Sequence, residues 1–221
     1  MKTLLYNNRY YLICYLIVLG YVASVLLTHD KVQIHRQMNA HVGNPLIDYF
    51  FMIITHLGDG IVAIILAFII SIKNVRMALY IILSYLSAGV VSYILKHWVY
   101  YDITRPHFTF QYFVREPLNL VDGVDILALH SFPSGHSLSA FALFFCLLFM
   151  SEKNWQKMLY FILAILAAYS RVHLSQHWLV DIFVGSIIGV SFSIIMYVIF
   201  YKNAKFHYLD KGIRQLVTKQ K

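Results

Sequence analysis

Long runs of apolar residues separated by short polar segments dominate the chain. A helix that crosses the hydrocarbon core of a bilayer needs about 20 largely apolar residues. The pattern predicts six such helices, over residues 10–27, 49–72, 77–98, 137–151, 157–171 and 178–201. The fourth and fifth runs are short and carry polar residues at one end, which suits a protein-lined cavity at membrane depth. We therefore expect an all-α fold, a polytopic membrane protein with six transmembrane helices in one bundle.

The composition agrees with this expectation. Hydrophobic residues make up 60% of the chain and charged residues only 13%, which is too little charge to cover the surface of a soluble domain. A length of 221 residues predicts one membrane-embedded domain over residues 1–221. The first apolar run lacks a convincing signal-peptide cleavage site and is expected to be a retained helix. Cys14 and Cys146 lie inside apolar runs and are expected to be packing residues.

The net charge of +8 would suit nucleic-acid binding, but the cations lie mainly in short loops and in the tail, as topology signals do. Placing the amino terminus in the cytoplasm assigns 12 of the 18 basic residues to the inside. Both termini are then cytoplasmic, and residues 202–221 form a basic tail that suits the anionic inner leaflet. The loop over residues 99–136 faces outward. We expect no nucleic-acid partner.

The outward segment with the most reactive side chains runs from Ser170 to Asp181. His177 and Asp181 are four positions apart at the start of the sixth predicted helix, so their side chains would share one helix face. A carboxylate there can accept the proton on imidazole Nδ1, which fixes the tautomer and leaves Nε2 able to attack. The pair alone favours a structural hydrogen bond at a helix end, because such pairs are common.

A second polar segment, Phe132 to His136, comes directly before the fourth apolar run. Its Pro, Ser and Gly suit a helix start, where backbone N–H groups have no intrahelical partner. Those groups and the positive end of the helix dipole form an anion site. His136 would stand beside that site and could give a proton to a leaving oxygen. Ordinary capping of a transmembrane helix is the alternative interpretation.

Three cations flank these segments on the predicted outer face: Lys96, Arg105 and Arg171. Each of them singly could reach lipid headgroups and have no other role. Together they converge near two histidines and a helix start, and fixed cations match the negative charge of a phosphoryl group in transfer. The set predicts a phosphate site.

In this order the segments resemble the motifs of the type 2 phosphatidic acid phosphatase family, whose superfamily includes soluble vanadium haloperoxidases and bacterial acid phosphatases. The family motifs are a lysine, six residues and Arg-Pro; then Pro-Ser-Gly-His; then Ser-Arg, five residues, His, three residues and Asp. Pro133–His136 matches the second motif, and Ser170–Asp181 matches the third with full spacing. The first motif departs from the pattern, because eight residues rather than six separate Lys96 from Arg105. The catalytic motifs thus lie within residues 96–181.

The resemblance implies a role for each site residue. His177 would attack phosphorus and form a phosphohistidine, with Asp181 holding its ring. His136 would protonate the departing lipid oxygen and then activate the water that hydrolyses the intermediate. The phosphate oxygens would be held by Lys96, Arg105, Arg171 and the amides around Ser134 and Gly135. No metal or other cofactor is expected, because fixed cations replace it and the acidic residues form no ligand cluster in the sequence.

The segment from Thr55 to Gly60 places His56 and Asp59 inside the second apolar run. Ionisable residues at membrane depth usually face the interior of a bundle. These two either line or support the substrate cavity, or they form a buried polar pair that holds the helix to its neighbours. His173 is expected to have no catalytic role.

The preferred function is hydrolysis of a phosphomonoester or diphosphate of a membrane lipid, at the outer face of a bacterial inner membrane. The resemblance allows undecaprenyl diphosphate, phosphatidylglycerol phosphate, phosphatidic acid or a lipid A type glycolipid as the substrate. One alternative is a lipid-to-lipid phosphotransferase, which would share the phosphohistidine. The other is an anion transporter, which would not explain the spacing of His177 and Asp181. The expected partners are a lipid phosphate and the bilayer, and the sequence does not indicate an oligomeric state.

Overall fold

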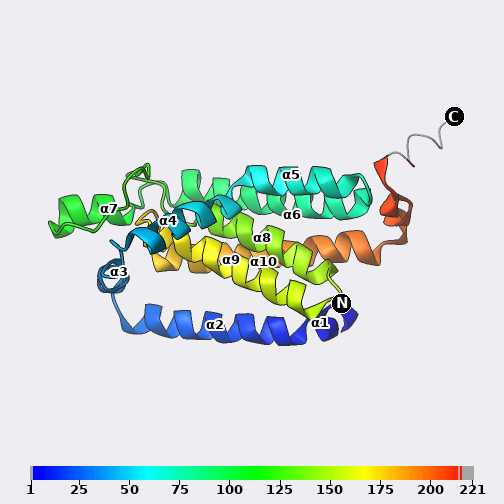
Figure 1. The fold of residues 1–221 in the computed structure, drawn as a ribbon, viewed down its shortest axis with the longest axis horizontal. Coiled ribbons are helices and arrows are strands. Elements are labelled where there is room, and N and C mark those ends of the chain that lie inside the picture. Colours follow the sequence, from blue (N-terminus) through cyan, green and yellow to red (C-terminus); the bar gives the residue numbers. More distant parts are fainter. Residues whose placement is uncertain (1, 214, 216–221) are drawn as a thin grey trace.

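The computed structural model describes residues 2–213 and 215, and this part of the chain folds into helices and loops without strands. Figure 1 shows an elongated bundle whose long helices run side by side along one axis. The α-helices are α1 (Lys2–Asn7), α2 (Arg9–Thr28), α3 (Lys31–Asn39), α4 (Pro45–Ile54), α5 (Gly60–Ser71), α6 (Val75–Ile94), α7 (Pro106–Thr109), α8 (Gly135–Met150), α9 (Asn154–His173) and α10 (Leu179–Lys202). The other helical turns are the 3₁₀ turns η1 (Thr55–Gly58) and η4 (Ala204–Asp210) and the π turns η2 (Leu95–Val99) and η3 (Phe110–Val114).

Three helices in the described part of the chain are long and apolar enough to cross a membrane: α2, α6 together with η2, and α10. The pair formed by α4–η1 and α5 passes the same test but is bent by 58°. The expectation of one span over 49–72 needs this correction, because Gly58 and Gly60 flank Asp59 and interrupt the helix there. The all-α class is confirmed, whereas the count of six spans stays a prediction.

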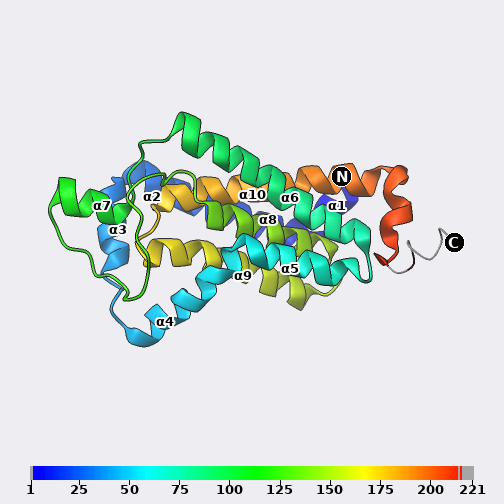
Figure 2. The same cartoon turned by 90° about the horizontal axis from the view of Figure 1, so that it is seen from above.

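Helix α8 occupies the centre of the bundle, with α6, α9 and α10 packed around it (Figure 2). Its side chains from Ser137 to Phe149 are buried around the whole circumference. A helix that is apolar on all sides belongs in the interior of a large protein or a membrane bundle. This position matters for function because the Pro-Ser-Gly-His motif leads into the first turn of α8.

Two glycines allow α10 to approach α8 closely. A Cβ atom on Gly185 would lie 2.7 Å from the carbonyl oxygen of Ser134, and one on Gly189 would lie 2.5 Å from that of Leu138. Small residues permit such close packing of helices in membranes. The approach brings the start of α10 against the start of α8, where the N–H of Ser134 donates to the carbonyl oxygen of Asp181 at 3.1 Å.

The opposite end of the bundle holds α1 and η4 (Figure 1). Arg76, in the first turn of α6, is buried there and donates to the carbonyl oxygen of Phe200 at 3.1 Å and to the carboxylate of Asp210 at 2.9 Å. These bonds fasten η4 to the bundle. The predicted basic tail continues through residues 214 and 216–221, which lie outside the described residues.

Candidate active site

His177 and Asp181 form a buried pair at the end of the bundle away from α1 and η4. Nδ1 of His177 lies 3.2 Å from Oδ2 of Asp181, and the two side chains are 2% and 1% exposed. The structure corrects the expectation of a shared helix face, because α10 begins at Leu179 and His177 lies in the loop before it. The pair therefore forms across a turn of the chain, and it leaves Nε2 of the imidazole out of this hydrogen bond.

Oδ2 of Asp181 accepts hydrogen bonds from two further donors. The hydroxyl of Ser131 donates to it, and the N–H of Trp178 donates to it at 2.9 Å. The bond from Trp178 closes the first turn of α10, so one carboxylate both caps a helix and orients the imidazole. A buried carboxylate needs such donors, and the donors in turn fix its position.

The Pro-Ser-Gly-His motif begins α8, as expected. Ser134 is the N-cap residue, and its Oγ accepts from the N–H of Ser137 at 3.4 Å. The N–H of Ser134, however, is engaged by the carbonyl oxygen of Asp181. We expected the amides around Ser134 and Gly135 to hold phosphate, and this contact removes the Ser134 amide from that set. At the described helix start, the amides of Gly135 and His136 are the donors left, because those of Ser137 and Leu138 donate to Ser134.

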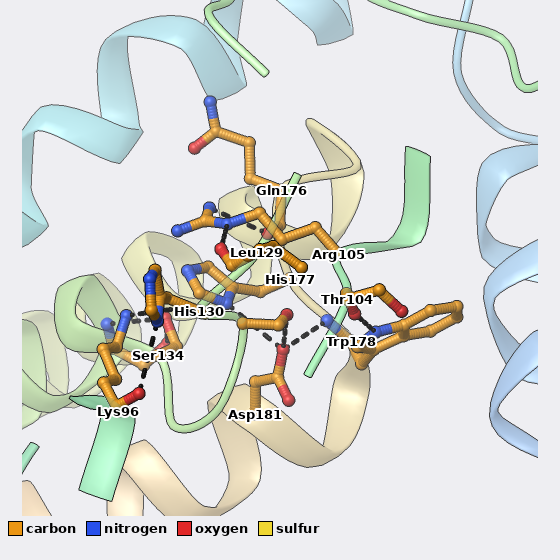
Figure 3. Close-up of polar contacts among 12 residues, drawn as sticks. Lys96, Thr104, Arg105, Leu129, His130, Ser134, Gln176, His177, Trp178 and Asp181 are labelled. Carbon is orange, nitrogen blue, oxygen red and sulfur yellow. Dashed lines mark hydrogen bonds and ion pairs between the residues drawn. The ribbon is translucent and has the colours of Figure 1, made fainter. Parts of the chain in front are cut away.

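Lys96 reaches the start of α8 although the first motif is two residues longer here than in the family that the motifs resemble. It lies in η2, the wide π turn that continues α6. Its Nζ donates to the carbonyl oxygen of His130 at 3.2 Å, and Figure 3 shows the side chain beside Ser134. Such π turns occur frequently at functional sites.

Arg105 is buried and held by backbone carbonyl groups. Its Nε donates to Leu129 at 3.0 Å, and its Nη1 donates to Gln176 at 3.0 Å. In Figure 3 the ring of His177 lies between the guanidinium of Arg105 and the carboxylate of Asp181. The imidazole thus has a fixed cation on one side and a fixed anion on the other.

Arg171 approaches from the last turn of α9 and is only 6% exposed. Its Nη1 donates to the hydroxyl of Thr55 in η1 at 2.7 Å. Its buried Nε has no hydrogen-bond partner among the residues that the structure describes. An unpartnered buried N–H is costly, and it is a donor that an anion can satisfy.

The surroundings of His177 determine its protonation state. Burial lowers the pKa of His177 well below its ordinary value, and the charges of Arg105, Lys96 and Arg171 lower it further. The imidazole is therefore neutral near pH 7. The neutral ring is the form whose Nε2 lone pair can attack an electrophile.

A cavity of about 370 Å³ opens beside the cluster; His136, Arg171 and Gln176 line it, whereas His177 is not among its lining residues. The side chain of Gln176 fastens the loop around Asp125 at this cavity, because its Nε2 donates to the carbonyl oxygen of Asp125 at 2.8 Å. In the described part of the chain, no group of three or more His, Cys, Asp or Glu side chains is arranged to hold a metal. The polar and charged residues that line the cavity include Thr55, His56, Asp59, His136 and Arg171.

Two further His–Asp contacts join residues far apart in the sequence. Nε2 of His136 lies 2.8 Å from Oδ1 of Asp59, and Nε2 of His173 lies 2.7 Å from Oδ1 of Asp48. Asp59 is conspicuous in the sequence as a carboxylate inside an apolar run, whereas nothing in the sequence pattern singles out Asp48. His173 contacts α4 through Asp48 and does not line the cavity.

Buried His35, in α3, supports the loop that carries His177. Its Nε2 lies 3.2 Å from Oγ of Ser175, and its ring packs against Trp178. Burial lowers the pKa of His35 from 6.5 to about 4. Because the pKa of His35 is lower in the folded than in the unfolded chain, the unfolded chain binds the proton first as the pH falls below about 6.5. Stability is then lost progressively down to pH 4, by at most about 3 kcal/mol.

The variant His35→Phe should therefore lose less thermal stability than the wild type between pH 7 and pH 4.5. Phenylalanine keeps the contact with Trp178 but has no proton to bind. Unfolding temperatures of both proteins in the same detergent would test this. Equal acid sensitivity of the two proteins would show that His35 does not contribute.

Comparisons with known proteins agree with this geometry. The model of the PAP2 superfamily matches residues 77–205, which hold all three motifs and more than half of the chain. The crystal structure of LpxE from Aquifex aeolicus is similar, with 30% identity, a TM-score of 0.64 and coverage of 74% of this chain and 92% of that one.

A second solved structure supports the fold alone. It is a transmembrane PAP2 type phosphatidylglycerolphosphate phosphatase from Bacillus subtilis, with 22% identity, a TM-score of 0.60 and coverage of 94% of this chain and 100% of that one. No curated protein matches the chain. From the matched family model and the LpxE structure we conclude that the chain belongs to the PAP2 superfamily.

Proposed function

We propose that the chain is a metal-independent lipid phosphatase that uses His177 as its nucleophile and a phosphohistidine as its intermediate. One observation carries the proposal: a neutral, buried imidazole is held by Asp181 and surrounded by three cations. The carboxylate orients the ring, the cations attract a phosphate, and the imidazole supplies the electron pair. Membership of the PAP2 superfamily supports the same chemistry.

The phosphate would bind between the cations and the start of α8. Lys96, Arg105 and Arg171 provide the charge, and the amide of Gly135 adds a donor at the positive end of the helix dipole. Hydrogen bonds from charged donors are roughly twice as strong as those between neutral groups. Fixed cations in this arrangement do what Mg²⁺ does in many other phosphoryl-transfer sites.

The reaction has two steps. In the first, Nε2 of His177 attacks phosphorus while the lipid oxygen leaves, and His136 gives that oxygen a proton. The positive charge that develops on the ring of His177 is stabilised by Asp181. In the second, His136 takes a proton from water, the water oxygen attacks phosphorus, and the N–P bond breaks to release inorganic phosphate.

The substrate would be a phosphomonoester or diphosphate of a membrane lipid. Support comes from the apolar helices that carry the site and from the solved Bacillus subtilis relative, which by its name acts on phosphatidylglycerolphosphate. The same chemistry suits undecaprenyl diphosphate, phosphatidic acid and lipid A type glycolipids. Six spans with both termini in the cytoplasm would place the site at the outer face of a bacterial inner membrane.

A panel of these lipids, each presented singly to the purified protein, tests the proposal. At least one lipid should release inorganic phosphate, and a chelator should leave that rate unchanged within about twofold, since no step needs a metal. A protein that moves phosphate only onto a second lipid would be a phosphotransferase. No phosphate release from any lipid, or release that depends strictly on added Mg²⁺, would contradict the proposal.

A further inference from the structure

The bend between α4 and α5 presents a carboxylate to the site. Asp59 stands at the N-cap position of α5, where an aspartate commonly accepts from the first N–H groups of its own helix. Its side chain makes no such bond. Instead, Oδ1 lies 2.8 Å from Nε2 of His136 and Oδ2 lies 2.8 Å from Nδ1 of His56. The carboxylate of Asp59 therefore contacts two imidazoles instead of capping its own helix.

The backbone around Asp59 is shaped for this contact. In Figure 2 the bent segment runs beside α9, and η1 packs against both α8 and α9. A Cβ atom on Gly58 would lie 2.9 Å from the carbonyl oxygen of His136, and one on Gly60 would lie 2.0 Å from the hydroxyl of Tyr85. Glycine at position 58 lets the segment approach the backbone of α8, and glycine at position 60 leaves room for the side chain of Tyr85 on α6.

The charges around His136 show why a carboxylate is useful here. His136 must carry a proton to act as an acid, yet burial, Arg171 and Lys96 all oppose its protonation, and its pKa is lowered from 6.5 to about 4. Asp59, in direct contact with His136, is the anion that counters these effects in part, and the imidazole of His177 faces the same ring from the loop before α10. Without Asp59, a protonated His136 would stand among cations and lose the carboxylate that contacts it directly.

We propose that Asp59 is the positioning residue of His136: it fixes the ring through Nε2 and stabilises the protonated form, so that Nδ1 serves the leaving oxygen. This inference rests on the function proposed above. In this arrangement His177 and His136 each have a carboxylate of their own, and the two rings are held through opposite nitrogens. His177 is held at Nδ1 by Asp181 and reacts through Nε2, whereas His136 is held at Nε2 by Asp59.

The proton balance follows from this geometry. Protonated His136 donates from Nδ1 to the ester oxygen as the P–O bond breaks, while Asp59 keeps the proton on Nε2. Neutral His136 then accepts a proton at Nδ1 from the attacking water, which restores the starting state. The contact with Asp59 uses Nε2 of His136, and its Nδ1 has no hydrogen-bond partner among the described residues. His56 holds the second oxygen of Asp59 from the exposed side, with 72% of its side chain accessible.

The variant Asp59→Asn tests the inference, because it keeps the shape of the side chain and removes the charge. We expect kcat for phosphate release to fall about 10- to 100-fold, with KM changed less than about threefold. The alkaline limb of the pH–rate profile should move to lower pH by about one unit, since the protonated acid loses its counter-charge. Asp59→Glu keeps the charge and should recover part of kcat.

Asp48→Asn is the matched control. It breaks the other His–Asp contact of the bent segment, in which Asp48 holds His173 away from the cavity. This variant should leave the pH midpoint of the alkaline limb unchanged even if it lowers stability. An equal shift in both variants would mean that the effect is structural and would overturn the inference.

Two other results are equally decisive. Unchanged or faster phosphate release by Asp59→Asn, in a preparation whose wild type is active, would overturn the role of Asp59 and leave the proposed function intact. Faster release would mean that the contact restrains His136 until the substrate binds. A wild type that releases phosphate from no lipid would instead refute the proposed function, and the inference with it.

Discussion

Replacing His177 with alanine is expected to lower phosphate release by about 10⁴-fold or more, because the variant has no nucleophile to form the intermediate. Phosphate binding should persist, since the three cations come from other segments of the chain. Rates of phosphate release with the best lipid of the panel would measure the loss.

His173→Ala is the matched control for this variant. It also removes a buried imidazole that is paired with an aspartate, but that pair lies outside the cavity. Its activity per folded molecule should stay within about tenfold of the wild type. An alanine variant of His177 that kept a tenth or more of the wild-type rate would rule out His177 as the nucleophile.

Replacing Asp181 with asparagine should have the second-largest effect, a loss of about 10³-fold in kcat. An amide can still accept from the N–H of Trp178 but carries no charge to stabilise the ring of His177 as it becomes positive. The wrong tautomer of the imidazole would then be favoured as well. Steady-state rates at saturating substrate would measure this loss.

Ser131→Ala provides the comparison, since it removes one donor to the same carboxylate and leaves the charge in place. Its loss should be within about tenfold. If Asp181→Asn were no worse than Ser131→Ala, the carboxylate would serve only to cap α10, and its proposed role at the imidazole would be wrong.

Much of this arrangement could be predicted from sequence because its signals are local. Apolar runs indicate where helices lie, and the boundaries of α6 and α10 fall within a few residues of the predicted spans. The motifs mark which ends of the helices carry chemistry. The structure brings Lys96, Arg105 and Arg171 close to His177, which the order of the motifs alone had suggested.

The remaining features depend on contacts between distant segments. The bend at Asp59 follows from glycines whose neighbours, His136 and Tyr85, lie on other helices. Nothing in the sequence distinguishes Ser131 from other loop residues, and its contact with the buried carboxylate of Asp181 forms only in the fold. The engagement of the Ser134 amide likewise arises only when α10 meets α8. No periodicity or spacing encodes these contacts, because each needs the packed bundle.

The central claim is that His177 becomes covalently phosphorylated during turnover. The direct measurement is to mix the protein with a lipid labelled in its phosphate group, quench the reaction in alkali within its first turnover, and map the label by mass spectrometry of peptides. The account predicts alkali-stable, acid-labile phosphate on His177 of the wild type. Rapid turnover with no covalent label, or label on any other residue, would contradict it.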